Sequence, residues 1–344
     1  MSEAPLIVAD ELQCLFTVRR GPVEFIRGKA SRIHAVDTVS FTLERAEILA
    51  LVGESGCGKS TVGRMLVKME EPTAGALTFA GETVNALSGA RLKEFRRRAQ
   101  MIFQNPFEAF DPRLTIGTSL QQAMQIHNIG KDQHDRLQRI VTVMERSGLT
   151  PAEDFLSRYP HELSGGQSQR IATVRVMLLS PEFVVADEPV SMLDVSIRVG
   201  VLNLMKRLAD DSGLSFLYIT HDIASARYIS DHTNVMYAGR MVEGAPSDEL
   251  VHEPAHPYTR LLLSAVPNPH AGLRTQETVA RGEIPSLIDP PPGCPFAARC
   301  PHVMPVCREV MPNAVTIAPN HWVRCHLYGD GGVSPLPTAA NSVG

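Results

Sequence analysis

The most constraining feature of the chain is a nine-residue run rich in glycine. It reads Gly53, Glu54, Ser55, Gly56, Cys57, Gly58, Lys59, Ser60 and Thr61. An apolar stretch at 48–52, typical of a buried strand, precedes it, and apolar positions at 62, 65, 66 and 69 predict a helix after it. Strand, glycine-rich loop and helix form the context that the phosphate-binding pattern G-x-x-x-x-G-K-[ST] requires. The run therefore predicts binding of a nucleoside triphosphate.

The chemistry of the loop supports this interpretation. Glycines let backbone N–H groups approach an anion, and the helix N-terminus adds partial positive charge. Lys59 can reach the β- and γ-phosphates, and Ser60 is placed to ligate Mg²⁺. An ordinary glycine-rich turn before a helix is the alternative, and it does not explain the complete match in this context.

Length and charge limit the class of protein. The 344 residues suffice for one large domain or two ordinary ones, and the formal net charge of −4 gives no general basic field for nucleic acid. We interpret the basic cluster at 91–98 as the solvated face of a helix. No apolar run approaches the roughly 20 residues of a membrane span, and the N-terminus lacks the parts of a signal peptide. We expect a cytosolic chain or one peripheral to a membrane.

Strand-like and helical segments alternate along the chain, which predicts a parallel α/β sheet. Strands are expected at 11–18, 35–43, 48–52, 76–80, 184–186 and 216–220, and a helix at 132–147. From residue 267 onward proline becomes dense, and we expect no regular sheet to continue there. The polar stretch from 329 to 344 is expected to be disordered.

Two further motifs carry chemistry. The apolar run 183–186 delivers Asp187 and Glu188, of which the first can hold the Mg²⁺ shell and the second can polarise the attacking water. Ser164, Gly165, Gly166 and Gln167 open a helix and form a second anion cradle. Two cradles beside a single loop lysine suggest that the chain works as a dimer.

These motifs, taken in order, resemble those of ATP-binding cassette (ABC) ATPases over about residues 10–330. The segment 163–167 resembles the signature motif, and Gln104, Asp194 and His221 resemble the glutamine-loop, D-loop and switch-histidine residues. The resemblance implies an α/β fold with a RecA-like P-loop NTPase core, a β-rich N-terminal subdomain and an inserted helical subdomain. The cassette is expected at 1–265, with the helical subdomain at about 105–165.

Several segments look like the oligopeptide/dipeptide importer subfamily. They lie at 34–37, 159–162 and 256–262, and the cysteine-bearing block from 293 to 327 is similar to the C-terminal extension of that subfamily. The extension is expected at 266–328 and the tail at 329–344. Residues 18–21 resemble the F-type member of the paired ATPases.

The resemblance implies a mechanism in which two cassettes pair head to tail. ATP then lies between the phosphate loop of one cassette and the Ser164–Gln167 cradle of the other. Glu188 is implied as base or water-orienting group, and His221 as a contact of the γ-phosphate. Ser60, Gln104 and Asp187 are implied as Mg²⁺ ligands. Asp194 and Phe16 are counted with the nucleotide-binding residues, the latter as a candidate for stacking on adenine.

Four of the six cysteines gather in the C-terminal part, at Cys294, Cys300, Cys307 and Cys325. Intervals of five, six and seventeen residues match neither common zinc spacings nor ferredoxin runs, so spacing alone indicates only four soft ligands. Unlinked structural cysteines or a disulfide stay open as alternatives. The subfamily resemblance favours a [4Fe-4S] cluster, with Zn²⁺ as runner-up, in a structural role.

The expected function is ATP hydrolysis that energises the import of di- and oligopeptides, with oligosaccharide or nickel import as alternatives. The expected partners are two transmembrane permease subunits, a second ABC ATPase (a heterodimer or a homodimer) and, indirectly, an extracytoplasmic substrate-binding protein. Such a chain lies on the cytoplasmic face of the inner membrane. A soluble ABC ATPase acting on nucleic acid or ribosomes is a remote alternative. A cassette without hydrolysis is disfavoured because Lys59, Asp187, Glu188 and His221 are all present.

Overall fold

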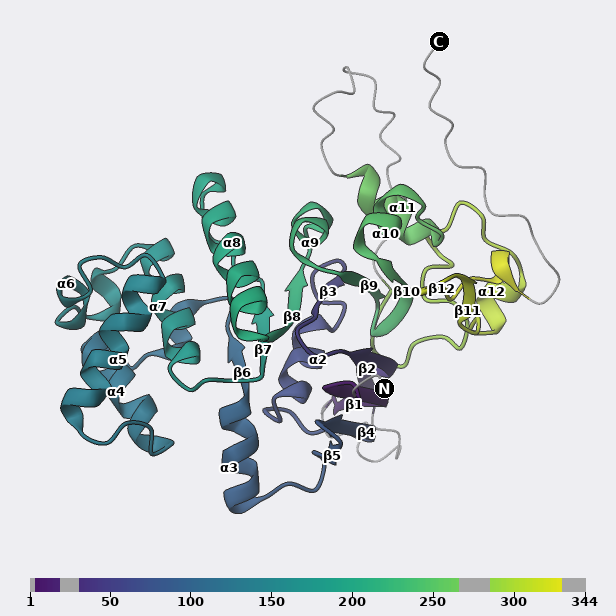
Figure 1. Ribbon diagram of the computed structural model, residues 1–344. Helices are drawn as coiled ribbons and strands as arrows, with labels where there is room; N and C mark the ends of the chain where they lie inside the picture. Colours follow the sequence, from purple (N-terminus) through teal and green to yellow (C-terminus); the bar gives the residue numbers. More distant parts are fainter. Residues whose placement is uncertain (1–3, 19–30, 266–284, 330–344) are drawn as a thin grey trace, which may run out of the picture.

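A computed structural model describes residues 4–18, 31–265 and 285–329. Its strands form two sheets, one of four strands in the order β2-β1-β4-β5 and one of eight in the order β11-β12-β10-β9-β3-β8-β7-β6 (Figure 1). The α/β class with a β-rich opening part is confirmed.

The smaller sheet is antiparallel. It contains β1 (Ile7–Thr17), β2 (Arg32–Leu43), β4 (Ala74–Phe79) and β5 (Glu82–Thr83). β1 pairs with β2 from Ile7↔Leu43 to Thr17↔Arg32. The buried side chains of β1 all belong to one core, as expected when a single face is covered: Ile7, Ala9, Leu12 and Cys14.

The larger sheet has a parallel centre made of β9 (His232–Tyr237), β3 (Ile48–Val52), β8 (Ser215–Thr220), β7 (Phe183–Asp187) and β6 (Ala99–Ile102). Every residue of β3, β7 and β8 is buried. Alternate residues enter two different cores: Leu49 and Leu51 pack with α2 (Lys59–Leu66), whereas Ala50 and Val52 pack on the opposite face. Uniformly apolar strands therefore mark a sheet covered on both sides.

Helices α8 (Val195–Ser212) and α9 (Ile223–Ile229) cover that second face. A separate group consists of α4 (Ile116–Ile126), α5 (Gln133–Arg146), α6 (Glu153–Leu156) and α7 (Gly165–Met177), with short 3-10 turns at Pro106–Ala109 and Pro160–Glu162. These helices share a core of their own at the β6 end of the sheet (Figure 1). The helix expected at 132–147 is confirmed as α5, which the Asp132 side chain caps. Helix α3 (Gly89–Arg98) leads into β6.

The C-terminal part corrects one expectation. After β10 (Arg240–Pro246), α10 (Ser247–His252) and α11 (Pro257–Ser264), two late strands extend the larger sheet: β11 (Val315–Ala318) and β12 (His321–Val323). β12 pairs with β10, so the expectation that no regular sheet follows residue 267 was wrong. The reason is local, because both strands are free of proline and Pro319 lies in the turn that joins them. α12 (Val306–Glu309) and a 3-10 turn (His326–Tyr328) complete this part. The tail expected to be disordered lies, apart from Gly329, outside the described residues.

Among the described segments, no helix combines the length and the apolar character that a bilayer crossing needs.

Candidate nucleotide-binding site

The phosphate loop connects β3 to α2, and its backbone requires glycine. Gly58 has a φ of 107°, and a Cβ atom placed there would lie 2.1 Å from the carbonyl oxygen of Ala35. At Gly53 a Cβ atom would lie 2.1 Å from the carbonyl oxygen of Met236. Both positions therefore exclude any side chain, and at Gly58 the positive φ disfavours one as well. These two glycines fix the curvature of the loop.

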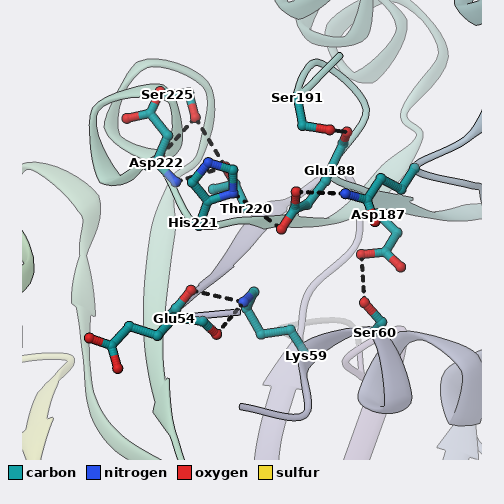
Figure 2. A network of polar contacts seen from close by, with 12 residues as sticks. Glu54, Lys59, Ser60, Asp187, Glu188, Ser191, Thr220, His221, Asp222 and Ser225 are labelled. Atoms are coloured by element: carbon teal, nitrogen blue, oxygen red, sulfur yellow. Dashed lines mark hydrogen bonds and ion pairs between the residues drawn. The ribbon is translucent and has the colours of Figure 1, made fainter. Parts of the chain in front are cut away.

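Lys59 is held inside the loop. Its Nζ atom donates to the carbonyl oxygens of Gly53 at 2.8 Å and Glu54 at 2.9 Å, and the residue is only 5% exposed (Figure 2). The loop thus closes around a positive charge at the N-terminus of α2, which is suited to a polyphosphate.

A hydroxyl and a carboxylate meet next to the lysine. Ser60 Oγ donates to Asp187 Oδ1 at 3.0 Å, which joins the start of α2 to the end of β7 (Figure 2). Burial raises the pKa of Asp187, while the hydrogen bond from Ser60 opposes this rise. Hydroxyl and carboxylate oxygens are ligands that Mg²⁺ accepts.

Glu188 is the centre of a second group of contacts. Gln104 Nε2 donates to Glu188 Oε2 at 3.1 Å, and His221 Nδ1 lies 3.2 Å from Glu188 Oε1. Glu188 has a φ of 45°, a conformation that costs a non-glycine residue free energy and that clusters at functional sites. Gln104, Glu188 and His221 follow β6, β7 and β8, whose carboxyl ends meet at one edge of the parallel sheet.

The second anion cradle is formed but lies elsewhere. Ser164 and Gln167 make a reciprocal capping box at the start of α7, with Ser164 N to Gln167 Oε1 at 3.0 Å and Gln167 N to Ser164 Oγ at 3.4 Å. Gly165 and Gly166 form the first turn of this helix. Because α7 belongs to the helical group, the cradle stands apart from α2 and the phosphate loop (Figure 1).

The remaining expected residues are placed as follows. Asp194 precedes α8 as its N-cap residue. Phe16 lies on β1 opposite Ile33, and its ring is substantially exposed. Neither residue takes part in the contacts around Lys59 or Glu188 described above.

Two contacts of the phosphate loop were not foreseen from the sequence. Tyr258 Oη accepts a hydrogen bond from the Glu54 N–H at 2.8 Å, and Arg299 forms an ion pair with the Glu54 carboxylate at 2.8 Å. The segment containing Tyr258 stood out in the sequence, but nothing there linked it or Arg299 to the loop.

The four C-terminal cysteines line one small cavity together with His302 and His326. Backbone N–H groups of His302 and Met304 point at Cys300 Sγ and Cys307 Sγ, at 3.4 and 3.5 Å. Burial raises the pKa of Cys294 to about 11 and that of Cys325 to about 12. The donor set suits a soft metal, but among the residues described no three His, Cys, Asp or Glu side chains are arranged as metal ligands. The four thiols thus share one cavity without forming a ligand set, and the expected iron–sulfur cluster is not shown.

Comparison with known proteins identifies the family. Residues 36–191 match the ABC transporter family, and residues 242–307 match the oligopeptide/dipeptide transporter C-terminal region. The putative oligopeptide transport ATP-binding protein YkfD of Bacillus subtilis is 46% identical over 91% of this chain and 95% of its own. The dipeptide transport ATP-binding protein DppF of Haemophilus influenzae is 43% identical over 90% of this chain and 92% of its own.

Solved structures agree with the fold. The ATP-binding cassette MJ0796, solved as a dimer in a post-hydrolysis state with ADP and phosphate, matches with a TM-score of 0.62 at 23% identity. The match covers 70% of this chain and 98% of the cassette. The chain belongs to the ABC transporter family, as an ATP-hydrolysing subunit of the oligopeptide/dipeptide transporter type.

Proposed function

We propose that this ATPase energises the import of di- and oligopeptides through a membrane permease. One observation carries the ATPase part: Lys59, Asp187 and Glu188 converge at the carboxyl edge of the parallel sheet, next to a loop that excludes any side chain at its first and last glycines. The peptide cargo is supported by the C-terminal match over residues 242–307 and by relatives that are named for peptide import.

In the proposed reaction the phosphate loop and Lys59 hold the β- and γ-phosphates of ATP. Ser60, Asp187 and Gln104 would hold Mg²⁺, which neutralises developing phosphate charge when bound. Glu188 accepts a proton from the water that attacks the γ-phosphorus, and the Pγ–O bond to ADP breaks. His221, half exposed beside Glu188, would contact the γ-phosphate.

The position of the second cradle supports a paired mechanism. Ser164–Gln167 and Asp194 would meet the nucleotide held by the loop of another cassette, and closure of the pair would exclude water. The dimer reported for MJ0796 supports this arrangement. The resemblance of residues 18–21 to the F-type member of the paired ATPases favours a second, non-identical cassette as partner. Phe16, exposed on β1, is the proposed contact for adenine.

The same proposal includes the surroundings of the chain. Two permease subunits would anchor it to the cytoplasmic face of the membrane, and a substrate-binding protein outside would deliver the cargo. Residues 1–265 would form the cassette, with a helical subdomain at about 105–165, followed by the extension at 266–328 and the tail at 329–344. The separate core shared by α4–α7 supports the inserted subdomain.

Uptake by cells tests the cargo. A strain lacking the gene is complemented with the unaltered chain or with Lys59→Ala, and uptake of a labelled tripeptide, an oligosaccharide and Ni²⁺ is compared. We expect only the unaltered chain to restore uptake, and only for the peptide. The peptide proposal would be contradicted if the deletion strain and both complemented strains took up the peptide equally. It would also be contradicted if the unaltered chain restored uptake of another solute alone.

We propose that the four cysteines hold a soft metal centre, either iron–sulfur or zinc, which fixes the extension. The supporting observation is that all four line one cavity, although they are not in ligand positions here. The chain isolated without oxygen should contain stoichiometric iron with sulfide, or zinc, and Cys300→Ser should lose it. Metal-free chain with unchanged unfolding behaviour would contradict the proposal.

A further inference from the structure

An ion pair connects the phosphate loop to the far end of the chain. Arg299 Nη1 donates to Glu54 Oε2 at 2.8 Å and Nη2 donates to Oε1 at 2.9 Å, a bidentate arrangement across 245 positions of sequence. The side chains are 7% and 25% exposed, so solvent and salt screen the pair only weakly. Charge-assisted bidentate pairs are among the stronger and more directional hydrogen-bonded contacts.

Every polar group of Glu54 is engaged. Its carboxylate binds Arg299, its N–H donates to Tyr258 Oη at 2.8 Å, and its carbonyl oxygen accepts from Lys59 Nζ at 2.9 Å. Figure 2 shows the carboxylate directed away from Lys59 while the backbone of Glu54 faces it. Glu54 therefore links the lysine that receives the phosphates to two residues from the C-terminal part of the chain.

Arg299 is itself held firmly. Its Nη1 donates to Tyr237 Oη at 3.2 Å, and its guanidinium lies 5.7 Å from the ring centre of Tyr237 and 5.8 Å from that of Phe296. Phe296 is buried against Tyr237 and Tyr258, with ring centres 5.3 and 5.5 Å apart. The ion pair with Glu54 raises the pKa of Arg299 further above its usual range, which keeps the guanidinium charged.

We propose that the C-terminal segment sets the conformation of the phosphate loop, with Arg299 as a positioning residue for nucleotide binding. Arg299 and Tyr258 fix Glu54 from outside the loop, and Glu54 in turn fixes the carbonyl oxygen that orients Lys59. The segment thus controls affinity for nucleoside di- and triphosphates without touching them. The inference rests on nucleotide binding by this loop and not on the cargo of the transporter.

The test is a double-mutant cycle in the full chain with Arg299→Gln, Glu54→Gln and the combination of both. The Kd for Mg·ADP is measured, because ADP lacks the γ-phosphate and is not hydrolysed during the measurement. We expect each single change to raise the Kd roughly tenfold or more, the order that follows from misplacing a binding group. The double variant should bind Mg·ADP no more weakly than the weaker-binding single variant, because both substitutions remove the same Arg299–Glu54 contact.

Matched variants separate positioning from folding. Arg227→Gln removes the exposed ion pair with Asp248, whose Nε–Oδ1 distance is 2.7 Å, and should leave the Kd unchanged. Arg299→Lys keeps the charge and should recover part of the affinity, and thermal unfolding of each variant is followed in parallel. If Arg299→Gln does not fold, Glu54→Gln and Tyr258→Phe carry the same test.

Two results would overturn the inference. One is a Kd within twofold of the unaltered chain for folded Arg299→Gln or Glu54→Gln, with only the unfolding temperature lowered. The other is multiplicative weakening in the combined variant, which would show that the two residues act independently. If the uptake experiment failed to support peptide as the cargo, these binding results would still hold, because they measure only nucleotide affinity.

Discussion

A buried carboxylate ties the C-terminal part of the chain to the cassette sheet. Glu243 of β10 is fully buried, and its Oε1 atom accepts from the Ala255 N–H at 2.7 Å and from His321 Nε2 at 2.8 Å. Oε2 accepts from the His256 N–H at 2.9 Å. One side chain therefore satisfies three donors, from the approach to α11 and from β12.

Glu243→Gln should destabilise the fold measurably. The amide replaces one acceptor oxygen by an NH₂ donor, so one of the three donors loses its partner at about 1–3 kcal/mol. Two further effects oppose each other: the remaining amide oxygen accepts weaker hydrogen bonds, and a buried charge is removed. We therefore keep about 1–3 kcal/mol as the predicted loss of stability. With a slope of roughly 3 kcal/mol/M in urea, the unfolding midpoint should fall by about 0.3–1 M.

The assay is urea unfolding followed by far-UV circular dichroism. The matched control is Glu253→Gln on the exposed surface nearby, for which a change within about 0.5 kcal/mol is expected. Glu243→Ala leaves all three donors without a partner and should cost more than Gln. A Glu243→Gln midpoint equal to that of the control would refute the assignment of Glu243 as the structural link.

Two further predictions concern the loop and Asp187, the carboxylate proposed to hold Mg²⁺. Gly58→Ala should abolish binding of a fluorescent ATP analogue, because its Cβ atom would lie 2.1 Å from a carbonyl oxygen. The control Gly81→Ala, whose Cβ atom meets nothing within 4 Å, should bind the analogue normally. Binding by both variants would contradict this prediction. Asp187→Asn should raise the unfolding temperature at pH 7 while removing ATP hydrolysis, because a buried carboxylate with a raised pKa destabilises the nucleotide-free fold once ionised. This rise in unfolding temperature should shrink as the pH falls through the pKa of Asp187, because the carboxylate then becomes neutral in the unaltered chain. A rise that does not depend on pH would contradict the reasoning.

The nucleotide-binding part of the site was largely predictable because its signals are local. The loop 53–61 carries its own conformational requirement, and strand ends that deliver Asp187 and Glu188 meet at one edge of any parallel sheet. The helix at Gln133–Arg146 was predictable for a similar reason, since its periodicity, the Asp132 cap and the glycine after it lie within one segment. The roles of Gln104, Asp194 and Phe16 came from resemblance alone and stay predictions.

Contacts between distant parts of the chain were not predictable. No local pattern pairs Arg299 with Glu54 or His321 with Glu243, since both contacts depend on how the C-terminal part returns to the cassette. The same return brings β12 alongside β10, which proline density had led us to exclude. At the cysteine cavity, resemblance suggested a cluster, but the side chains are not in ligand positions.

The most direct test of the central claim uses Glu188→Gln. The substitution keeps a side chain of the same length beside Gln104 and His221 but removes the proposed base, and a base contributes about 10²–10⁴-fold to such a reaction. The tagged variant is expressed in its native host, and membranes are solubilised gently with Mg·ATP. We predict loss of ATP hydrolysis and recovery of two permease subunits, with a second cassette, in the ATP-trapped state. ATP hydrolysis at the native rate, or recovery of ribosomes or nucleic acid without any membrane protein, would contradict the claim.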